Sequence, residues 1–249
     1  MTLNEAVTDD ALLGGRVILR QPAAGYRAGI DPVALAAAVP AGKGDTVLDI
    51  GSGVGAAALC LAARVPECRV YGVEIQRDLV RLAAENVALN GFAGRIEGMV
   101  GGLTRPPPRL AAGSFHHVMS NPPYRAAGGG NPPPNAGKAT STIEAAGDLA
   151  DWVDFCVRMV RHKGSVTFIH RADRLDELLA YLRHKTGGLA VYPLWPTADR
   201  ARPAKRVIVQ AIKGGAGPLK LLPGLILHEG DGYTPEAEAV LRHGAGLTL

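Results

Sequence analysis

The sequence predicts an α/β protein with a mostly parallel sheet and helices on both of its faces. Short β-rich runs alternate with helix-like runs along most of the chain, and a Gly-x-Gly-x-Gly turn directly follows one of these strands. The length of 249 residues suits one α/β domain. We therefore expect a single domain over residues 1–249, with an N-terminal cap over 1–44 and a core and tail over 45–249.

The expected elements follow from β-rich apolar runs and from apolar residues at helical spacing. Strands are expected at residues 46–50, 69–74, 95–100, 115–120, 165–170, 189–195 and 206–213. Helices are expected at residues 56–64, 77–90, 148–162 and 175–185. Asp31-Pro32 suggests a helix N-cap followed by proline at the first helical position. The tail Leu219–Leu249 is apolar and glycine-rich without a clear period, and no role follows from it.

Composition indicates a soluble, cytoplasmic protein without a metal centre or a membrane span. The three cysteines are an odd number and lack metal-ligand spacing, and no apolar run approaches the ~18 residues of a membrane helix. Between Asp151 and Lys220 there are thirteen Lys and Arg residues against six Asp and Glu. This concentration of positive charge suits a polyanionic partner such as RNA, although a solvated helical face would give the same count.

The glycine turn has the pattern of a nucleotide-binding site. Gly51, Gly53 and Gly55 lie between a strand and a helix, where missing Cβ atoms let a ligand approach the backbone and a helix N-terminus. Asp49 precedes the turn, and Glu74 ends the next strand, where a carboxylate can accept both hydroxyls of a ribose. A dinucleotide-binding fold would show the same pattern, and a purely structural turn is the simpler alternative.

The tetrapeptide Asn121-Pro122-Pro123-Tyr124 follows the strand at 115–120, at an edge where open α/β sheets bind ligands. The Asn121 side-chain oxygen and the Pro122 carbonyl can accept the two hydrogens of a planar amino group. Both prolines restrict φ, which fixes these acceptors in advance, and Tyr124 offers a flat face for stacking. This pattern favours methylation of an exocyclic amine over a rigid turn with an exposed tyrosine. The Gly- and Pro-rich segment Arg125–Gly147 comes next and is either a substrate loop or a surface insertion.

Several motifs together resemble the tRNA1(Val) adenine-N6 methyltransferases, a family of class I S-adenosyl-L-methionine-dependent enzymes. The matching motifs extend over nearly the whole chain and are Thr8-Asp9-Asp10, Gln21-Pro22, Gly25-Tyr26-Arg27, Asp31-Pro32-Val33-Ala34-Leu35-Ala36, Leu194-Trp195-Pro196, the Arg206-Val207 strand and Leu225–Tyr233. The resemblance implies a Rossmann-like, mostly parallel seven-stranded sheet, S-adenosyl-L-methionine as the cofactor and a tRNA substrate.

The glycine turn and the tetrapeptide, together with the resemblance, which adds Tyr26, Arg27 and Asp31, give a set of expected site residues. The expected catalytic residues are Asn121, Pro122 and Tyr124. The expected cofactor-binding residues are Tyr26, Arg27, Asp31, Asp49, Gly51, Ser52, Gly53, Gly55, Glu74, Ile75, Gly102 and Asn121. Most class I enzymes have an acid after the third strand that contacts the adenine amino group of the cofactor, but this chain has Gly101-Gly102 there. We therefore expect one polar contact fewer at the adenine.

Other functions are compatible with the same motifs. Glutamine-N5 methylation of a protein and guanine-N2 methylation of ribosomal RNA use the same type of tetrapeptide. A non-catalytic RNA-binding protein that retains the fold belongs to another class, but the intact glycine turn and tetrapeptide speak against it. An NAD-dependent oxidoreductase is disfavoured because no acid/base pair for hydride transfer is apparent.

Overall fold

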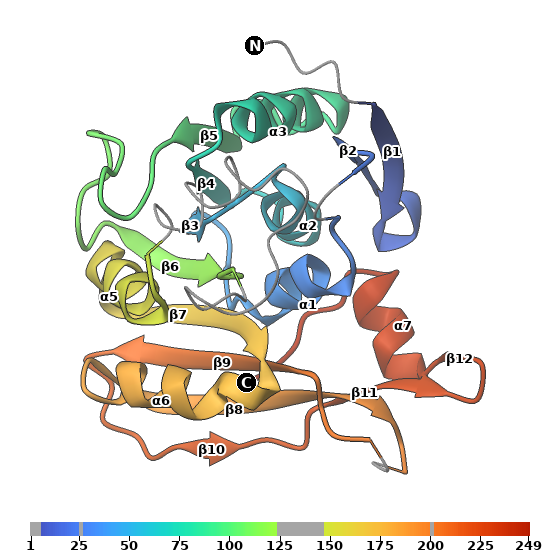
Figure 1. The fold of residues 1–249 in the computed structure, drawn as a ribbon, viewed down its shortest axis with the longest axis vertical. Coiled ribbons are helices and arrows are strands. Elements are labelled where there is room, and N and C mark those ends of the chain that lie inside the picture. The colour runs from blue at the N-terminus through green and yellow to red at the C-terminus, as the bar shows by residue number, and fades with distance from the viewer. Residues whose placement is uncertain (1–5, 25–26, 124–146, 200–201) are drawn as a thin grey trace.

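The structure is a computed structural model, and it describes residues 6–24, 27–123, 147–199 and 202–249. A ten-stranded, mostly parallel sheet runs through the molecule, from β5 at the top of the view in Figure 1 to β8, β10 and β11 at the bottom. The strand order is β12-β11-β8-β9-β7-β6-β3-β4-β5, and β10 pairs separately with β8. The expected Rossmann-like α/β fold is confirmed.

From β3 to β6, the elements before residue 124 agree closely with the sequence-based boundaries. They are β1 (Val7–Leu12), β2 (Val17–Pro22), α1 (Ile30–Ala38), β3 (Thr46–Ile50), α2 (Ala56–Arg64), β4 (Arg69–Glu74), α3 (Arg77–Leu89), β5 (Ile96–Val100) and β6 (Phe115–Ser120). The later elements are α5 (Leu149–Met159), β7 (Val160–Arg171), α6 (Leu175–Arg183), β8 (Thr186–Thr197), β9 (Arg206–Lys213), β10 (Lys220–Leu221), β11 (Leu225–Glu229), β12 (Gly232–Tyr233) and α7 (Pro235–Leu241).

Parallel pairing brings the ends of distant strands to one edge of the sheet. β3 pairs in parallel with β4 and β6, and β6 pairs in parallel with β7. β9 runs antiparallel to β7, so its first residue, Arg206, lies opposite Arg171 at the end of β7. The turn after β3, Glu74 at the end of β4, Asn121 after β6 and the start of β9 therefore share the carboxyl edge of the parallel strands.

The core lies on both faces of this sheet. Side chains alternate along each strand, so Val47 of β3 belongs to a cluster with α1, α2 and α7, whereas Leu48 belongs to a cluster with α5 and α6. Both residues have no exposed surface. Because both faces are covered, successive residues such as Val47 and Leu48 of β3 or Val118 and Met119 of β6 are all buried, which is typical of parallel sheets.

The sheet has more strands than the expected seven, because the tail contributes to it. β11 pairs in parallel with β8 and extends the sheet, and α7 packs on α1. Thr234 caps α7: its hydroxyl accepts from the Ala237 N–H and donates to the Ile226 carbonyl. The tail, for which the sequence suggested no role, therefore completes one end of the domain.

Two further differences concern the N-terminal cap. β1 and β2 form an antiparallel hairpin beside α2 and α3, which the sequence did not predict (Figure 1). The prediction of Asp31 as a helix N-cap was wrong, because α1 starts at Ile30 with Gly29 as its N-cap. The Asp31 carboxylate instead accepts from the Arg206 guanidinium of β9 at 2.8 Å. Within the described residues, no helix is both long and apolar enough to cross a membrane.

Candidate functional site

The turn after β3 is a tight backbone structure held by β4. The N–H groups of Gly51 and Ser52 both donate to the Val73 carbonyl, at 2.8 and 3.1 Å, and Gly55 N–H donates to the Ser52 carbonyl. Gly51 has a φ of 73°, and a Cβ there would lie 2.7 Å from the Trp152 ring of α5. Both the positive φ and the close ring require glycine at this position.

Glu74 is tied to this turn and is almost fully buried. One carboxylate oxygen accepts from the Gly53 N–H at 3.1 Å, and the other accepts from the Gln76 N–H at 2.8 Å. Only 7% of the residue is exposed. These bonds fix the carboxylate at the end of β4 beside the glycine turn, while each oxygen keeps a second lone pair for a ligand hydroxyl.

Asp49 is a buried carboxylate directly before the turn. Its residue is 2% exposed, and within the described part of the chain its Oδ2 has no hydrogen-bond partner. Burial, followed by repulsion from Glu74, raises the pKa of Asp49 to about 7. A cation bound next to this carboxylate would restore its negative form.

The next part of the edge is apolar. Ile75 follows Glu74 and is 37% exposed, and a Cβ on Gly102 would lie 3.3 Å from the Ile75 side chain. Gly101 cannot carry a side chain, because a Cβ there would lie 2.5 Å from Pro107. The sequence has neither Asp nor Glu from residue 98 to residue 143. The expectation that the adenine of the cofactor has one polar contact fewer stays a prediction.

Asn121 lies next to the glycine turn. Ser120, the last residue of β6, pairs with Ile50 of β3 on one side and with Phe168 of β7 on the other. The Ser120 hydroxyl also donates to the Ile50 carbonyl at 2.8 Å, which locks β6 to β3 just before both strands end. Pro122 is buried and Pro123 is exposed. Tyr124 lies outside the described residues.

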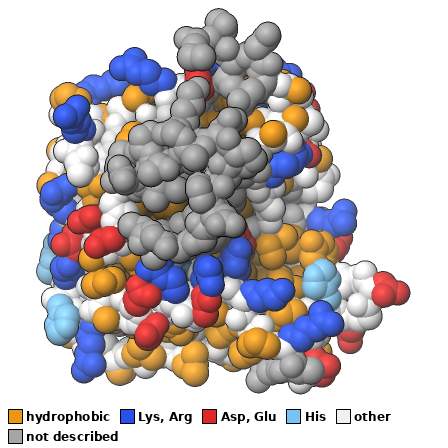
Figure 2. All heavy atoms as spheres, viewed as in Figure 1, with side chains coloured by type: hydrophobic (Ala, Val, Ile, Leu, Met, Phe, Trp, Pro, Cys, Tyr) orange, Lys and Arg blue, Asp and Glu red, His pale blue; other side chains and the backbone are white. Residues whose placement is uncertain are grey.

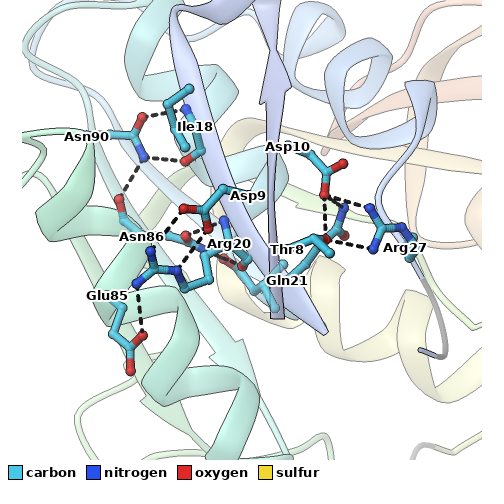
Figure 3. Close-up of polar contacts among 11 residues, drawn as sticks. Thr8, Asp9, Asp10, Ile18, Arg20, Gln21, Arg27, Glu85, Asn86 and Asn90 are labelled. Carbon is cyan, nitrogen blue, oxygen red and sulfur yellow. Dashed lines mark hydrogen bonds and ion pairs between the residues drawn. The ribbon is translucent and has the colours of Figure 1, made fainter. Parts of the chain in front are cut away.

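The N-terminal hairpin holds the segment that leads into α1, as Figure 3 shows. The Arg27 guanidinium donates to the Thr8 hydroxyl at 2.8 Å and to the Asp10 carboxylate at 2.7 Å. Gln21, which is 2% exposed, accepts from the Ala28 N–H at 2.9 Å. Arg27 thus bonds to β1, and its expected role at the cofactor stays a prediction. Tyr26 lies outside the described residues.

Sequence reasoning did not single out two buried polar side chains near this edge. His170, near the end of β7, has no exposed surface, and burial lowers its pKa to about 4, with nearby arginines adding to the effect. Its strand pairs with β6 just before Asn121. Asn86 of α3 is also fully buried and bonds to the glycine turn. The order of the parallel strands could have located His170, but Asn86 appears in sequence only as one polar residue of an amphipathic helix.

Comparison with known proteins is consistent with this geometry. The model of the methyltransferase small domain matches residues 28–145. A tRNA1(Val) (adenine(37)-N6)-methyltransferase of Aeromonas hydrophila is 41% identical over 71 residues, which are 28% of this chain and 30% of that protein. A release factor glutamine methyltransferase of Deinococcus radiodurans is 40% identical over 62 residues, which are 24% of this chain and 22% of that protein. The matches thus span less than a third of these curated relatives.

Solved structures extend the similarity to most of the chain. A protein from Agrobacterium tumefaciens, described as a predicted O-methyltransferase, has a TM-score of 0.73 and 26% identity, with 87% of this chain and 98% of that chain covered. An S-adenosylmethionine-dependent O-methyltransferase from Thermotoga maritima has a TM-score of 0.54 and 17% identity, with 76% and 67% covered, and shares the fold.

The sheet order, the glycine turn and these similarities define a class I S-adenosyl-L-methionine-dependent methyltransferase. The fold of the chain is that of this class, and its residues 28–145 match the methyltransferase small domain. Its cofactor is S-adenosyl-L-methionine.

The residues at the carboxyl edge fit this cofactor. Glu74 could accept the ribose hydroxyls, and the exposed Ile75 and the bare Gly102 could enclose the adenine. The unpaired Asp49 oxygen could balance the positive charges of the amino group and the sulfonium. When bound, the cofactor supplies a methyl group on a positively charged sulfur.

The raised pKa of Asp49 gives a test of this arrangement. In the folded protein the pKa is about 7, against an ordinary 3.8, so folding favours the protonated form. This carboxyl therefore lowers stability as the pH rises from about 4 to about 7. We expect Asp49→Asn to stabilise the cofactor-free protein at pH 8, by up to about 4 kcal/mol at about 1.4 kcal/mol per pKa unit, and to have little effect near pH 4.

Thermal unfolding between pH 4 and pH 8 measures this difference, with Asp78→Asn at an exposed acid of α3 as the control. Calorimetry should also show that Asp49→Asn weakens cofactor binding at pH 8, because the ionised carboxylate attracts the cationic ligand. A variant that is no more stable than the wild type at pH 8, and that binds the cofactor equally well, would contradict the assignment.

Proposed function

We propose that this protein transfers a methyl group from S-adenosyl-L-methionine to adenine N6 in a tRNA, most specifically the anticodon-loop adenine of a valine tRNA. The observation that carries the proposal is the position of Asn121-Pro122-Pro123 at the end of β6, one strand from the glycine turn. The similarity to tRNA1(Val) (adenine(37)-N6)-methyltransferases over 71 residues supports the choice of adenine.

In this reaction, Asn121 and Pro122 must orient an exocyclic amine, which is a poor nucleophile. The lone pair of an exocyclic amine is delocalised into its ring, so it attacks only weakly. The Asn121 side-chain oxygen and the Pro122 carbonyl accept hydrogen bonds from the two N–H bonds of the amine. This directs the nitrogen lone pair towards the methyl group. The new N–CH₃ bond forms as the S–CH₃ bond breaks, and the electron pair of the broken bond stays on sulfur. The cationic nitrogen then loses a proton to water, so no strong base is needed.

Positive charge beside Asn121 supports a polyanionic substrate. Arg171 ends β7 and Arg174 follows it, while Lys205 precedes β9 and Arg206 begins it. All four lie at the same carboxyl edge as Asn121. Figure 2 shows Lys and Arg side chains, mixed with Asp and Glu, below the grey region of this face. Most of this charge is balanced within the protein: Arg171 pairs with Asp173, Arg174 with Glu177 and Arg206 with Asp31. Lys205 is exposed.

Methylation of a glutamine side chain in a protein is the second candidate. It rests on the similarity to a release factor glutamine methyltransferase and on the same acceptor geometry, because a primary amide also presents two N–H groups. A glutamine substrate does not need a basic surface, which is why we favour RNA.

Transfer of a labelled methyl group separates the two candidates. The whole chain is incubated with labelled cofactor and either unmodified bulk tRNA or unmodified release factor. We expect label in tRNA, and N6-methyladenosine as the labelled nucleoside after digestion. Label in release factor alone, or in a nucleoside other than adenosine, would contradict the proposal.

Substitution of Asn121 tests its assigned role. Asn121→Ala removes one of the two proposed acceptors, and we expect kcat to fall by about 100-fold or more, because this contact orients the attacking nitrogen. The cofactor Kd, measured by calorimetry, should change by less than about threefold. An unchanged kcat, or a loss of cofactor binding as large as the loss of rate, would show that Asn121 acts differently.

Charge reversal tests the basic edge. Lys205→Glu should raise the KM for tRNA and reduce the salt dependence of binding by about one unit of slope, because one phosphate contact is lost. Lys43→Glu is the matched control, because Lys43 is 78% exposed, pairs with Glu67 and precedes β3 at the opposite edge of the sheet. If both variants weaken tRNA binding equally, the carboxyl edge is not the contact surface.

A further inference from the structure

The β1–β2 hairpin is attached to the domain by two asparagine side chains, Asn86 of α3 and Asn90, the C-cap residue of the same helix. Asn86 and Asn90 are four residues apart and therefore lie on one face of this helix (Figure 3). The Asn86 side-chain oxygen accepts from the Arg20 N–H at 2.7 Å, and its Nδ2 donates to the Arg20 carbonyl at 2.8 Å. Asn90 does the same two residues earlier on β2, with the Ile18 N–H at 2.8 Å and the Ile18 carbonyl at 2.7 Å.

This pattern replaces a neighbouring strand. In β2, alternate residues present their N–H and C=O groups to the same side, and β1 covers only the other side. A primary amide carries both an acceptor and a donor, so each asparagine satisfies both backbone groups of one residue. Without them these four backbone groups would need water or another partner, at a cost of about 1–3 kcal/mol for each that is buried and unsatisfied.

The third hydrogen bond of Asn86 goes to a different part of the molecule from that of Asn90. The Asn86 Nδ2 also donates to the Val54 carbonyl, in the glycine turn, at 3.0 Å. The third hydrogen bond of Asn90 runs from its Nδ2 to the Asn86 carbonyl, inside α3. One turn before Asn86, Ala83 packs under Gly55: a Cβ on that glycine would lie 3.5 Å from the Ala83 Cβ. The glycine turn is thus held by β4 on one side and by Asn86 on another.

The hairpin continues this connection to the start of α1. Gln21 follows Arg20 on β2 and accepts from the Ala28 N–H. Three residues later, Asp31 pairs with Arg206 at the carboxyl edge. This connection runs from the glycine turn to the segment that enters α1. The Asn86 side chain bonds to both the glycine turn and the hairpin.

We propose that Asn86 is a positioning residue for cofactor binding, which couples the glycine turn to the N-terminal hairpin. The turn has three glycines with positive φ, at 51, 53 and 55, so its backbone has wide conformational freedom when it is not held. Fixing the Val54 carbonyl reduces the entropy that cofactor binding must otherwise remove. The inference concerns the cofactor alone and does not depend on which substrate is methylated.

Two alanine variants provide a matched comparison. Asn86→Ala and Asn90→Ala each remove one side chain that makes three hydrogen bonds, two of them to β2. We expect both variants to unfold at lower temperature. Asn86→Ala should raise the Kd for S-adenosyl-L-methionine about tenfold, the order expected when a bond that holds a binding loop is lost. Asn90→Ala should change this Kd by less than about threefold. Calorimetry below both unfolding temperatures measures the two values.

Equal increases of the Kd in the two variants would overturn the proposal, because they would reflect general loosening of the hairpin. An unchanged Kd in Asn86→Ala would overturn it as well, by showing that the bond to Val54 is only structural.

A measurement on the wild-type protein covers the case in which Asn86→Ala does not fold. Coupling between two sites is reciprocal, so the cofactor should also stabilise the hairpin through Asn86. We expect saturating S-adenosyl-L-methionine to slow amide hydrogen exchange at Arg20 by at least about threefold more than at Ile18. Equal protection at the two amides, or none at Arg20, would contradict the coupling. Neither experiment uses tRNA or release factor, so failure here would leave the proposed substrate standing, and the reverse.

Discussion

The site depends on the parallel pairing of β3 with β4 and with β6. This pairing aligns Ile50 with Val73 and with Ser120, so all three strands reach the same edge together. The glycine turn, Glu74 and Asn121 come from segments up to about seventy residues apart in sequence. Each lies at or directly after the end of a strand whose pairing register is fixed. The Ser120 hydroxyl then bonds to Ile50, the last residue of β3, and the Val73 carbonyl holds Gly51 and Ser52, the first residues beyond it. Strand pairing, more than loop structure, places the proposed cofactor residues and the proposed acceptor residues.

Buried polar groups set the electrostatics of this edge. Asp49 and Glu74 place two carboxylates against the glycine turn. Backbone N–H groups bond to both oxygens of Glu74, whereas Oδ2 of Asp49 has no partner among the described residues. Leaving the Asp49 oxygen without a partner costs folding energy, and a cationic ligand recovers part of that cost. A cationic ligand bound at this turn would therefore meet a carboxylate oxygen that the described residues leave unpaired. Farther along the edge, beyond Asn121, lie the exposed Lys205 and the arginines of β7 and β9, which pair with Asp173 and Asp31.

The sequence predicted the parts of the fold that follow local rules. The strands at 46–50 and 69–74 and the helix at 56–64 have the predicted boundaries, because each is a short buried run that ends at glycine or at a charged residue. The hairpin could not be predicted in this way, since its attachment comes from asparagines more than sixty residues away. The structure of the tail could not be predicted for the same reason, because β11 is defined by its pairing with the distant strand β8. Asp31 was assigned to a local cap, but a distant arginine takes its carboxylate.

The structure of the protein bound to S-adenosyl-L-homocysteine, the product of the cofactor, would test the account most directly. We expect the ribose hydroxyls on the Glu74 carboxylate, the adenine against Ile75 and Gly102, and the sulfur facing the Asn121 side chain. The adenine amino group should have no carboxylate partner, which would confirm the departure at Gly101-Gly102. A product molecule whose sulfur faces away from Asn121, or whose ribose contacts neither Glu74 nor the glycine turn, would contradict the assembly of the site at this edge.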